Sequence, residues 1–330
     1  MDALAANIAH EHADDGNTCT VPLHVVTATC DRIDFSQRFP MTDDLCMRGR
    51  VTWVGRSSLN VMIDIYNKAN PEDRILTAQF LMVCRDPTAT TSSVTVNSLL
   101  CETDEEKALF EQGAQAKIDR QERSKHSLTV SEPSGDEVRE IHKFFIEKPD
   151  QVIRGAYSYF DQSKQSTDTV HMSDTSLESI LMTQPQANNA QDKIFGGYLM
   201  RKAFELGRSS AYVFCGPGAK PFSISIDDIM FLQPVEIGSV IKFNSQVVYS
   251  AGSKSQVCSI SVDTEILNLK TGTSSKSNRF HFTFASAHVQ LRRVIPRTYE
   301  EAMDYLTGKR SVERAKEAHL AMNSSLSKYF

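Results

Sequence analysis

Two glycines at the start of an apolar segment are the residues best placed to do chemistry. Gly196 and Gly197 end a polar stretch that begins at Asn189, and a mostly apolar run follows them. Backbone amides in the first turn of a helix have no intrahelical acceptor, so they can bind an oxygen that gains negative charge during a reaction. Glycine leaves room for the reacting group to approach. The alternative is that the pair only lets a helix pack closely against a sheet.

Two further side chains are candidates for the rest of such a reaction. Asp31 lies in an apolar frame, which raises the pKa of a carboxyl group and suits a general base or, less readily, a nucleophile. Asp34, two positions along on the same face, is a second candidate for this role. The alternative for either residue is an aspartate that only ends a strand or forms a turn. Asn189 could orient water or substrate through its amide. A helix cap or an Asx turn explains an asparagine there as well, and Asn188 is its rival.

A third carboxylate belongs to the same set of candidates. Asp227 and Asp228 follow each other on a predicted strand, so only one of them can point to the inner face. The internal repeat described next selects Asp227. We keep Asp227 among the site residues but interpret it as structural rather than catalytic.

An internal repeat supplies the elements that must position these residues. An offset of 196 residues aligns Cys30–Phe35 with Ile226–Phe231 and Trp53–Val61 with Tyr249–Val257. In both copies the aspartate precedes an aromatic residue by 22 positions. Alternation of apolar and polar residues predicts antiparallel strands in both copies. They cover residues 47–54, 59–66 and 75–84 in the first copy, and 239–249, 255–263 and 278–284 in the second.

The segment after the glycines predicts how these strands are arranged. Residues 195–214 are apolar or small on most helix faces, which is typical of a helix wrapped by a sheet, and Pro217-Gly218 ends it. One long buried helix inside a curled antiparallel sheet, occurring twice, predicts an α+β protein of two tandem hotdog domains. The family resemblance given below further implies that this first domain lacks its N-terminal strand and helix start.

Length, charge and cysteine usage limit the class of protein. The 330 residues and 40% hydrophobic content suffice for two cores. A net charge of −5 without a basic stripe argues against a nucleic-acid partner, and no apolar run is long enough for membrane insertion. The seven cysteines are scattered without ligand spacing, so we expect reduced thiols and neither a metal nor a cofactor. We predict four parts: residues 1–130, an incomplete hotdog with a trailing helix; 131–173, a linker with a short helix; 174–290, the second hotdog; and 291–330, a helical tail.

Several motifs together resemble those of one family. Phe195–Gly207, Asp227–Phe231 and Phe280–Phe284 are similar to double-hotdog acyl-coenzyme A thioesterases, most closely the mitochondrial acyl-coenzyme A thioesterase 9 subfamily. Trp53–Gly55 and Phe80–Asp86 match as well, and the likeness covers residues 20 to 308 in collinear order.

The resemblance implies hydrolysis of fatty acyl-coenzyme A to a free fatty acid and coenzyme A. It places the site across the interface of the two hotdogs, where Asn189 of one copy works with Asp31 of the other beside the Gly196 and Gly197 amides. A reciprocal site using Asp227 would lack its opposing helix start. The resemblance also implies a homo-oligomer and a mitochondrial location, although the acidic N-terminal residues do not look like a transit peptide and leave a cytoplasmic location open.

Coenzyme A phosphates require cations at the mouth of such a site. The candidates by position are Lys193, Arg201, Arg56 and Lys254, each of which is also explained as a surface charge. Two other functions stay open. A hydratase acting on enoyl thioesters needs a His/Asp pair near the helix start, and no histidine lies between residues 172 and 280. A catalytically impaired paralogue could bind acyl-coenzyme A or only assemble with a partner.

Overall fold

The structure is a computed structural model. It describes the chain except for residues 38–41, 88–92, 126, 129, 147–168, 190–192, 228, 253–254, 270, 288 and 323. Lys254, Asp228 and the central part of the predicted linker over residues 131–173 therefore lie outside the described residues. None of the described helices is both long and apolar enough to cross a membrane.

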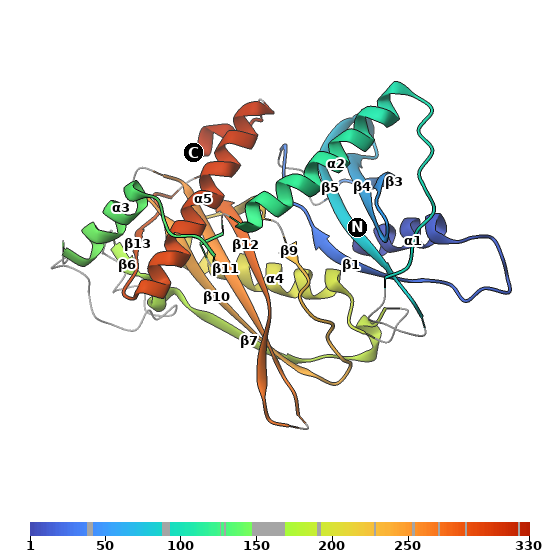
Figure 1. Ribbon diagram of the computed structural model, residues 1–330. Coiled ribbons are helices and arrows are strands. Elements are labelled where there is room, and N and C mark those ends of the chain that lie inside the picture. Colours follow the sequence, from blue (N-terminus) through green and yellow to red (C-terminus); the bar gives the residue numbers. More distant parts are fainter. Residues whose placement is uncertain are drawn as a thin grey trace.

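Two antiparallel sheets form the body of the molecule (Figure 1). The first has the order β3-β4-β5-β1-β9, with β1 (His24–Cys30), β3 (Leu45–Val54), β4 (Ser58–Asn67), β5 (Asn70–Arg85) and β9 (Ile229–Met230). The second has the order β2-β8-β12-β11-β10-β7, with β2 (Ile33–Asp34), β7 (Leu177–Met182), β8 (Phe222–Ile226), β10 (Val240–Ser250), β11 (Val257–Leu267) and β12 (Ser274–Ala285). A small parallel pair joins β6 (Thr169–His171) and β13 (Arg293–Ile295).

Two short strands are exchanged between the sheets. β2 comes from the first copy of the repeat but pairs with β8 of the second, and β9 comes from the second copy but pairs with β1 of the first. Each copy therefore completes the sheet of the other. The two repeats form one continuous structure at this junction.

Each sheet holds one central helix and is followed by an outer helix. The central helices are α1 (Asp2–Ala13), which packs on β1 and β3 to β5, and α4 (Gly196–Cys215), which packs on β10 to β12. The outer helices are α2 (Asp104–Lys125), which contacts β3, and α5 (Tyr299–Ala321), which contacts β10 to β12. One further helix, α3 (Gly135–Ile146), and three 3-10 turns, η2 (Met172–Thr175), η3 (Pro185–Ala187) and η4 (Ser327–Tyr329), complete the described elements. Figure 1 shows α4 and α5 with the second sheet between them.

The repeat holds down to single residues. The pairing of β3 with β4 shifts between Val51 and Trp53, and the pairing of β10 with β11 shifts between Val247 and Tyr249, at positions 196 residues apart. A β-bulge is a local feature that fixes register, so its recurrence identifies equivalent strands. The predicted α+β fold of two tandem hotdogs is confirmed, whereas the predicted domain boundaries stay a prediction.

Candidate active site at the junction of the two repeats

The start of α4 lies against a carboxylate from the other repeat. The amide of Gly197 donates a hydrogen bond to Oδ2 of Asp2, at 2.7 Å. Asp2 is the first residue of α1 and only 6% exposed. The hydroxyl of Thr27, on β1, donates to the other carboxylate oxygen of Asp2, also at 2.7 Å. Each oxygen of Asp2 is thus held by a donor, one from each repeat.

Both glycines are required by what lies next to them. A Cβ atom at Gly197 would lie 2.8 Å from Cβ of Asp2 and 3.0 Å from its Oδ2. A Cβ atom at Gly196 would lie 2.9 Å from the ring of Phe231. Glycine at position 196 therefore allows close packing against Phe231, as the packing interpretation of the glycine pair expected. Glycine at position 197 allows the carboxylate of Asp2 to approach the helix start.

The first-turn amides of α4 differ in what they bind. Gly197 binds Asp2, while the amides of Tyr198 and Leu199 both donate to the carbonyl oxygen of Phe195, at 3.1 and 3.3 Å. Within the described residues, the amide of Gly196 has no acceptor. A helix N-terminus carries a partial positive charge, so this amide is suited to an oxygen that becomes anionic.

Asn189 lies in the loop that leads into α4. Its backbone amide donates to the carbonyl oxygen of Lys193 at 2.6 Å, and its side-chain Oδ1 accepts from the amide of Lys193 at 3.0 Å. The side chain of Asn189 therefore stabilises a local turn, as the turn interpretation expected. Its catalytic role stays a prediction.

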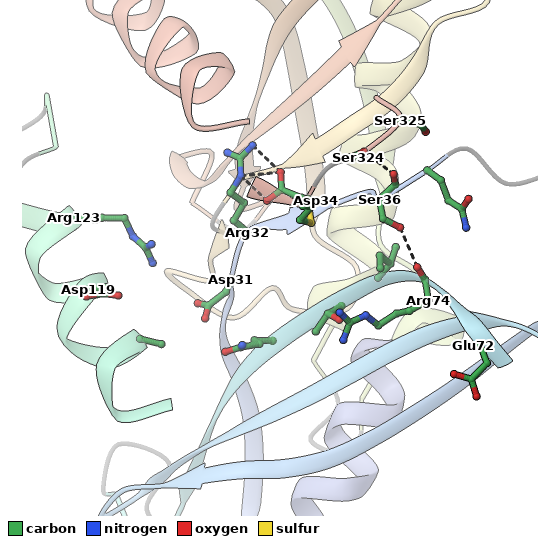
Figure 2. A pocket seen from close by; sticks show the side chains of 16 residues that line it. Asp31, Arg32, Asp34, Ser36, Glu72, Arg74, Asp119, Arg123, Ser324 and Ser325 are labelled. Carbon is green, nitrogen blue, oxygen red and sulfur yellow. Dashed lines mark hydrogen bonds and ion pairs between the residues drawn. The ribbon is translucent and has the colours of Figure 1, made fainter. Parts of the chain in front are cut away.

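Asp31 points to a different neighbour from the one expected. Both of its oxygens accept hydrogen bonds from Nη1 of Arg120 on α2, at 2.9 and 2.6 Å, and both side chains are 14% exposed. Side chains alternate across a strand, and Cys30 is fully buried, so the next residue faces the opposite side, where α2 lies. Figure 2 shows Asp31 in the space between β5 and α2. The acid bound to the Gly197 amide is Asp2 rather than Asp31.

Asp227 occupies the equivalent place in the second repeat. It is 5% exposed and accepts hydrogen bonds from Arg32 and, at 2.9 Å, from Nη2 of Arg314 on α5. The pair Asp227–Arg314 thus repeats the pair Asp31–Arg120, with each outer helix tied to the aspartate of its own repeat. These contacts favour the structural interpretation of Asp227. Burial lowers the pKa of neighbouring His281 to about 4, which makes it a poor base.

A pocket of about 880 Å³ lies beside these ion pairs and away from Asp2 (Figure 2). It is bounded by Asp31, Arg32 and Asp34, by β5, by α2 and by Ser324 and Ser325 near the end of the chain. Burial raises the pKa of Asp34, although Arg32 partly offsets this effect. Its acids and arginines form ion pairs, Arg32 with Asp34 inside the lining and Asp31 with Arg120 beside it, so we do not assign the reaction to this pocket.

The proposed phosphate-binding cations are mostly engaged with acids. Lys193 pairs with Glu236 at 2.5 Å and Arg201 with Glu205 at 2.9 Å, while Arg56 is exposed in the turn between β3 and β4. Lys254 lies outside the described residues. In the part of the chain that the structure describes, no cluster of three or more His, Cys, Asp or Glu side chains could hold a metal ion.

The two helix starts are not interchangeable. The whole of α4 carries one carboxylate, Glu205, and Arg201 and Lys202 pair with it on the surface. The acid of the site therefore comes from α1 and the amide from α4. The reciprocal site, with the acid on α4 and the amide on α1, would have to use Glu205, which is engaged with Arg201 and Lys202 on the surface.

Sequence reasoning missed Asp2 and Thr27. Asp2 is an aspartate in the first turn of a helix whose other residues up to Ala9 are small or apolar except Asn7, and its side chain is buried. An acid in the first turn of a mostly apolar helix is the signal by which the sequence could have identified Asp2.

The chain is similar to several known proteins. A family model described as "Thioesterase superfamily" matches residues 1–72. The chain is 35% identical over 312 residues to "Acyl-coenzyme A thioesterase 9, mitochondrial" of Bos taurus, covering 94% of this chain and 69% of the relative. It is 31% identical over 317 residues to "Acyl-coenzyme A thioesterase 2, chloroplastic" of Humulus lupulus, covering 92% and 70%. Among solved structures, an acyl-CoA hydrolase from Staphylococcus aureus in complex with butyryl coenzyme A and coenzyme A is similar at 22% identity with a TM-score of 0.43, covering 47% of this chain and 94% of that one.

Proposed function

The chain belongs to the acyl-coenzyme A thioesterase family, and from that premise we propose that it hydrolyses fatty acyl-coenzyme A at the Asp2–Gly197 junction. The products are a free fatty acid and coenzyme A. The relatives that carry the assignment include mitochondrial members, so we also propose a mitochondrial location and, as with a structure described as "Apo-Hexameric Acyl-CoA Thioesterase", an oligomer.

One observation carries the chemical part of this proposal. The carboxylate of Asp2 is held by Thr27 of its own repeat and by Gly197 of the other, so its orientation is fixed by two donors at 2.7 Å. A general base has to be within hydrogen-bond reach of the proton that it takes, and fixed neighbours keep it there.

The reaction proceeds in two proton transfers. Asp2 takes a proton from a water molecule, whose oxygen attacks the thioester carbonyl carbon. The carbonyl oxygen then carries negative charge, which the amide of Gly196 and the dipole of α4 stabilise. Collapse of this intermediate breaks the carbon–sulfur bond, and the protonated Asp2 returns its proton to the departing thiolate. The alternative, direct attack by Asp2 to form an anhydride, uses the same geometry.

Asn189 lies in the loop before Gly196, where its side chain can help to orient the thioester or the water. Two tertiary contacts hold the loop around Lys193 in place: the Lys193–Glu236 ion pair, and the hydrogen bond that the Ile194 amide donates to the carbonyl oxygen of Val235, at 2.9 Å. A braced loop keeps an orienting group in place more accurately than a loop without tertiary contacts.

A thiol-release assay over acyl-coenzyme A substrates of several chain lengths tests the proposal. Asp2→Asn keeps the shape of the side chain but removes the base, and kcat should fall by roughly 10² to 10⁴. Asp31→Asn is the matched control and should keep kcat within a few-fold. Full activity in Asp2→Asn would overturn the assignment. Binding of acyl-coenzyme A by the wild-type protein without thiol release would instead identify a binding protein.

A further inference from the structure

The β-bulges at the two strand exchanges are related by the internal repeat. The pairing of β1 with β5 skips Ala28, and the pairing of β8 with β12 skips Ile224, 196 positions later. The carbonyl oxygen of Ala28 accepts a hydrogen bond from the amide of Phe231, and that of Ile224 accepts one from the amide of Phe35, both at 3.0 Å. Each bulge therefore holds the phenylalanine that directly follows the strand supplied by the other repeat.

The bulge in β1 serves the proposed active site in two ways. Val25 and Cys30 are 4% and 0% exposed although five positions separate them, which requires one extra residue because side chains alternate along a strand. With the extra residue at Ala28, the side chain of Thr27 points inward and reaches Asp2. The carbonyl oxygen of Ala28 binds the second repeat. One irregularity in β1 thus places a donor on the acid and an acceptor at the exchanged strand.

Phe231 lies where it can fix the start of α4. A Cβ atom at Gly196 would lie 2.9 Å from Cε1 and Cζ of Phe231, so the ring occupies the side of the glycine where other residues carry their side chains. Glycine has more backbone freedom than any other residue, and a closely packed ring restricts that freedom. The ring therefore limits how far the amide of Gly196 can turn.

The segment that carries Phe231 is itself held at several points. The side-chain amide of Asn278, which is 4% exposed, donates to the carbonyl oxygen of Met230 at 2.5 Å. The amide of Phe231 is held by β1. Farther along, the side chain of Gln233 donates to the hydroxyl of Ser275 at 3.1 Å. A ring on a segment with these contacts keeps its place while substrate binds and product leaves.

We propose that Phe231 is a positioning residue for thioester hydrolysis, an inference that rests on the function proposed above. Its ring keeps the amide of Gly196 directed at the thioester oxygen as that oxygen gains negative charge. An amide stabilises such an intermediate only when it is directed at the place where the charge develops. Because the side chain of Phe231 has no polar atom, it acts through Gly196 and not on the substrate.

Steady-state thiol release by Phe231→Leu tests this role. Leucine stays apolar but lacks the flat ring, so kcat should fall roughly tenfold while KM changes by less than about twofold. This fall is smaller than the cost of losing an oxyanion donor, on the order of 10² to 10³, because the amide is still present but less well directed. An alkyl-coenzyme A thioether, which lacks the carbonyl oxygen, should bind the variant and the wild type with the same Kd.

Phe222→Leu is the matched control. Phe222 is also half-buried and belongs to the second repeat, but it packs against Tyr329, with 4.9 Å between the ring centres. Urea unfolding should show a similar loss of stability in both variants, whereas Phe222→Leu should keep the kcat of the wild type. If Phe231→Leu does not fold, Phe231→Met, which also removes the flat ring, takes its place.

Three results would overturn the role of Phe231: an unchanged kcat in its leucine variant, an equal fall of kcat in Phe222→Leu, or weaker thioether binding that accounts for the loss. Asp2→Asn in the same assay separates this inference from the proposed function. If Asp2→Asn is inactive while Phe231→Leu keeps its kcat, only the role of Phe231 is wrong. If Asp2→Asn retains full activity, the proposed reaction fails and the role of Phe231 fails with it.

Discussion

The carboxylate of Asp2 and the amide of Gly197 lie 2.7 Å apart although 195 positions separate them in the chain. One group belongs to the central helix of the first repeat and the other to the central helix of the second. Neither repeat contains both, so the geometry proposed for thioester hydrolysis exists only when the two repeats are docked. The internal duplication is thereby tied to the chemistry rather than to stability alone.

The hydroxyl of Thr27 is expected to matter for catalysis through Asp2. Thr27→Val keeps the shape of the side chain but removes the donor to Oδ1 of Asp2. We expect kcat to fall about tenfold with little change in KM, since a hydrogen bond to a charged group contributes on the order of 1.5 kcal/mol. Steady-state thiol release measures this.

Thr29, on the same strand, provides the control. Its hydroxyl is buried and has no hydrogen-bond partner among the described residues. Thr29→Val should leave kcat unchanged and should not destabilise the fold. An equal loss of activity in both variants would show that Thr27 does not position Asp2.

The contact between Gly196 and Phe231 predicts a stability effect. Gly196→Ala places a methyl group 2.9 Å from the ring, and the free energy of unfolding in urea should fall by about 1 to 3 kcal/mol. Combining it with Phe231→Leu, which gives the methyl group room, should recover part of the loss. Gly135→Ala is the control, because nothing lies within 4 Å of the added atom. A loss of the same size at Gly135 would contradict the steric explanation.

The ion pair between Asp31 and Arg120 should support the fold and not the reaction. Arg120→Met leaves a carboxylate that is 14% exposed without its guanidinium, and we expect a loss of about 2 kcal/mol in unfolding free energy. Arg120→Met combined with Asp31→Leu should be more stable than the single variant. Lys107→Met, in an exposed pair with Asp104, should cost at most about 0.5 kcal/mol. A large fall in kcat in folded Arg120→Met protein would reopen the role of Asp31.

Burial of His281 predicts a pH-dependent stability. Its pKa in the folded protein is about 4, below the 6.5 of an ordinary histidine, so between these values the unfolded chain binds the extra proton. Stability must therefore fall as the pH is lowered from 6.5 to 4, by on the order of 3 kcal/mol in total from this group. Urea unfolding of His281→Gln at pH 7 and pH 4.5 should show a smaller difference than wild type. The same replacement at exposed His142 should leave the difference unchanged.

Much of the fold follows from local sequence pattern. Alternation predicted strands over 47–54 and 59–66, where β3 and β4 cover Leu45–Val54 and Ser58–Asn67. The apolar run after Gly196 predicted α4 because a helix enclosed by a sheet is apolar on most faces. Both signals arise within single elements, so the sequence carries them directly.

The site depended on information that no single segment holds. The family resemblance implied Asp31 as the acid, and the repeat aligned it with Asp227, but both residues bind arginines of the outer helices. The face on which Asp31 lies follows from the burial of Cys30, which requires the register of the whole strand. Asp2 reaches Gly197 only through the docking of two helices, which spacing along the chain does not predict.

The exchange of β2 and β9 has a consequence for how the protein unfolds. Each repeat supplies one strand to the sheet of the other, so a substitution that destabilises one repeat should destabilise the other as well. Heat should therefore unfold both repeats in a single cooperative step. The acid donor and the amide donor would then be lost together rather than one after the other.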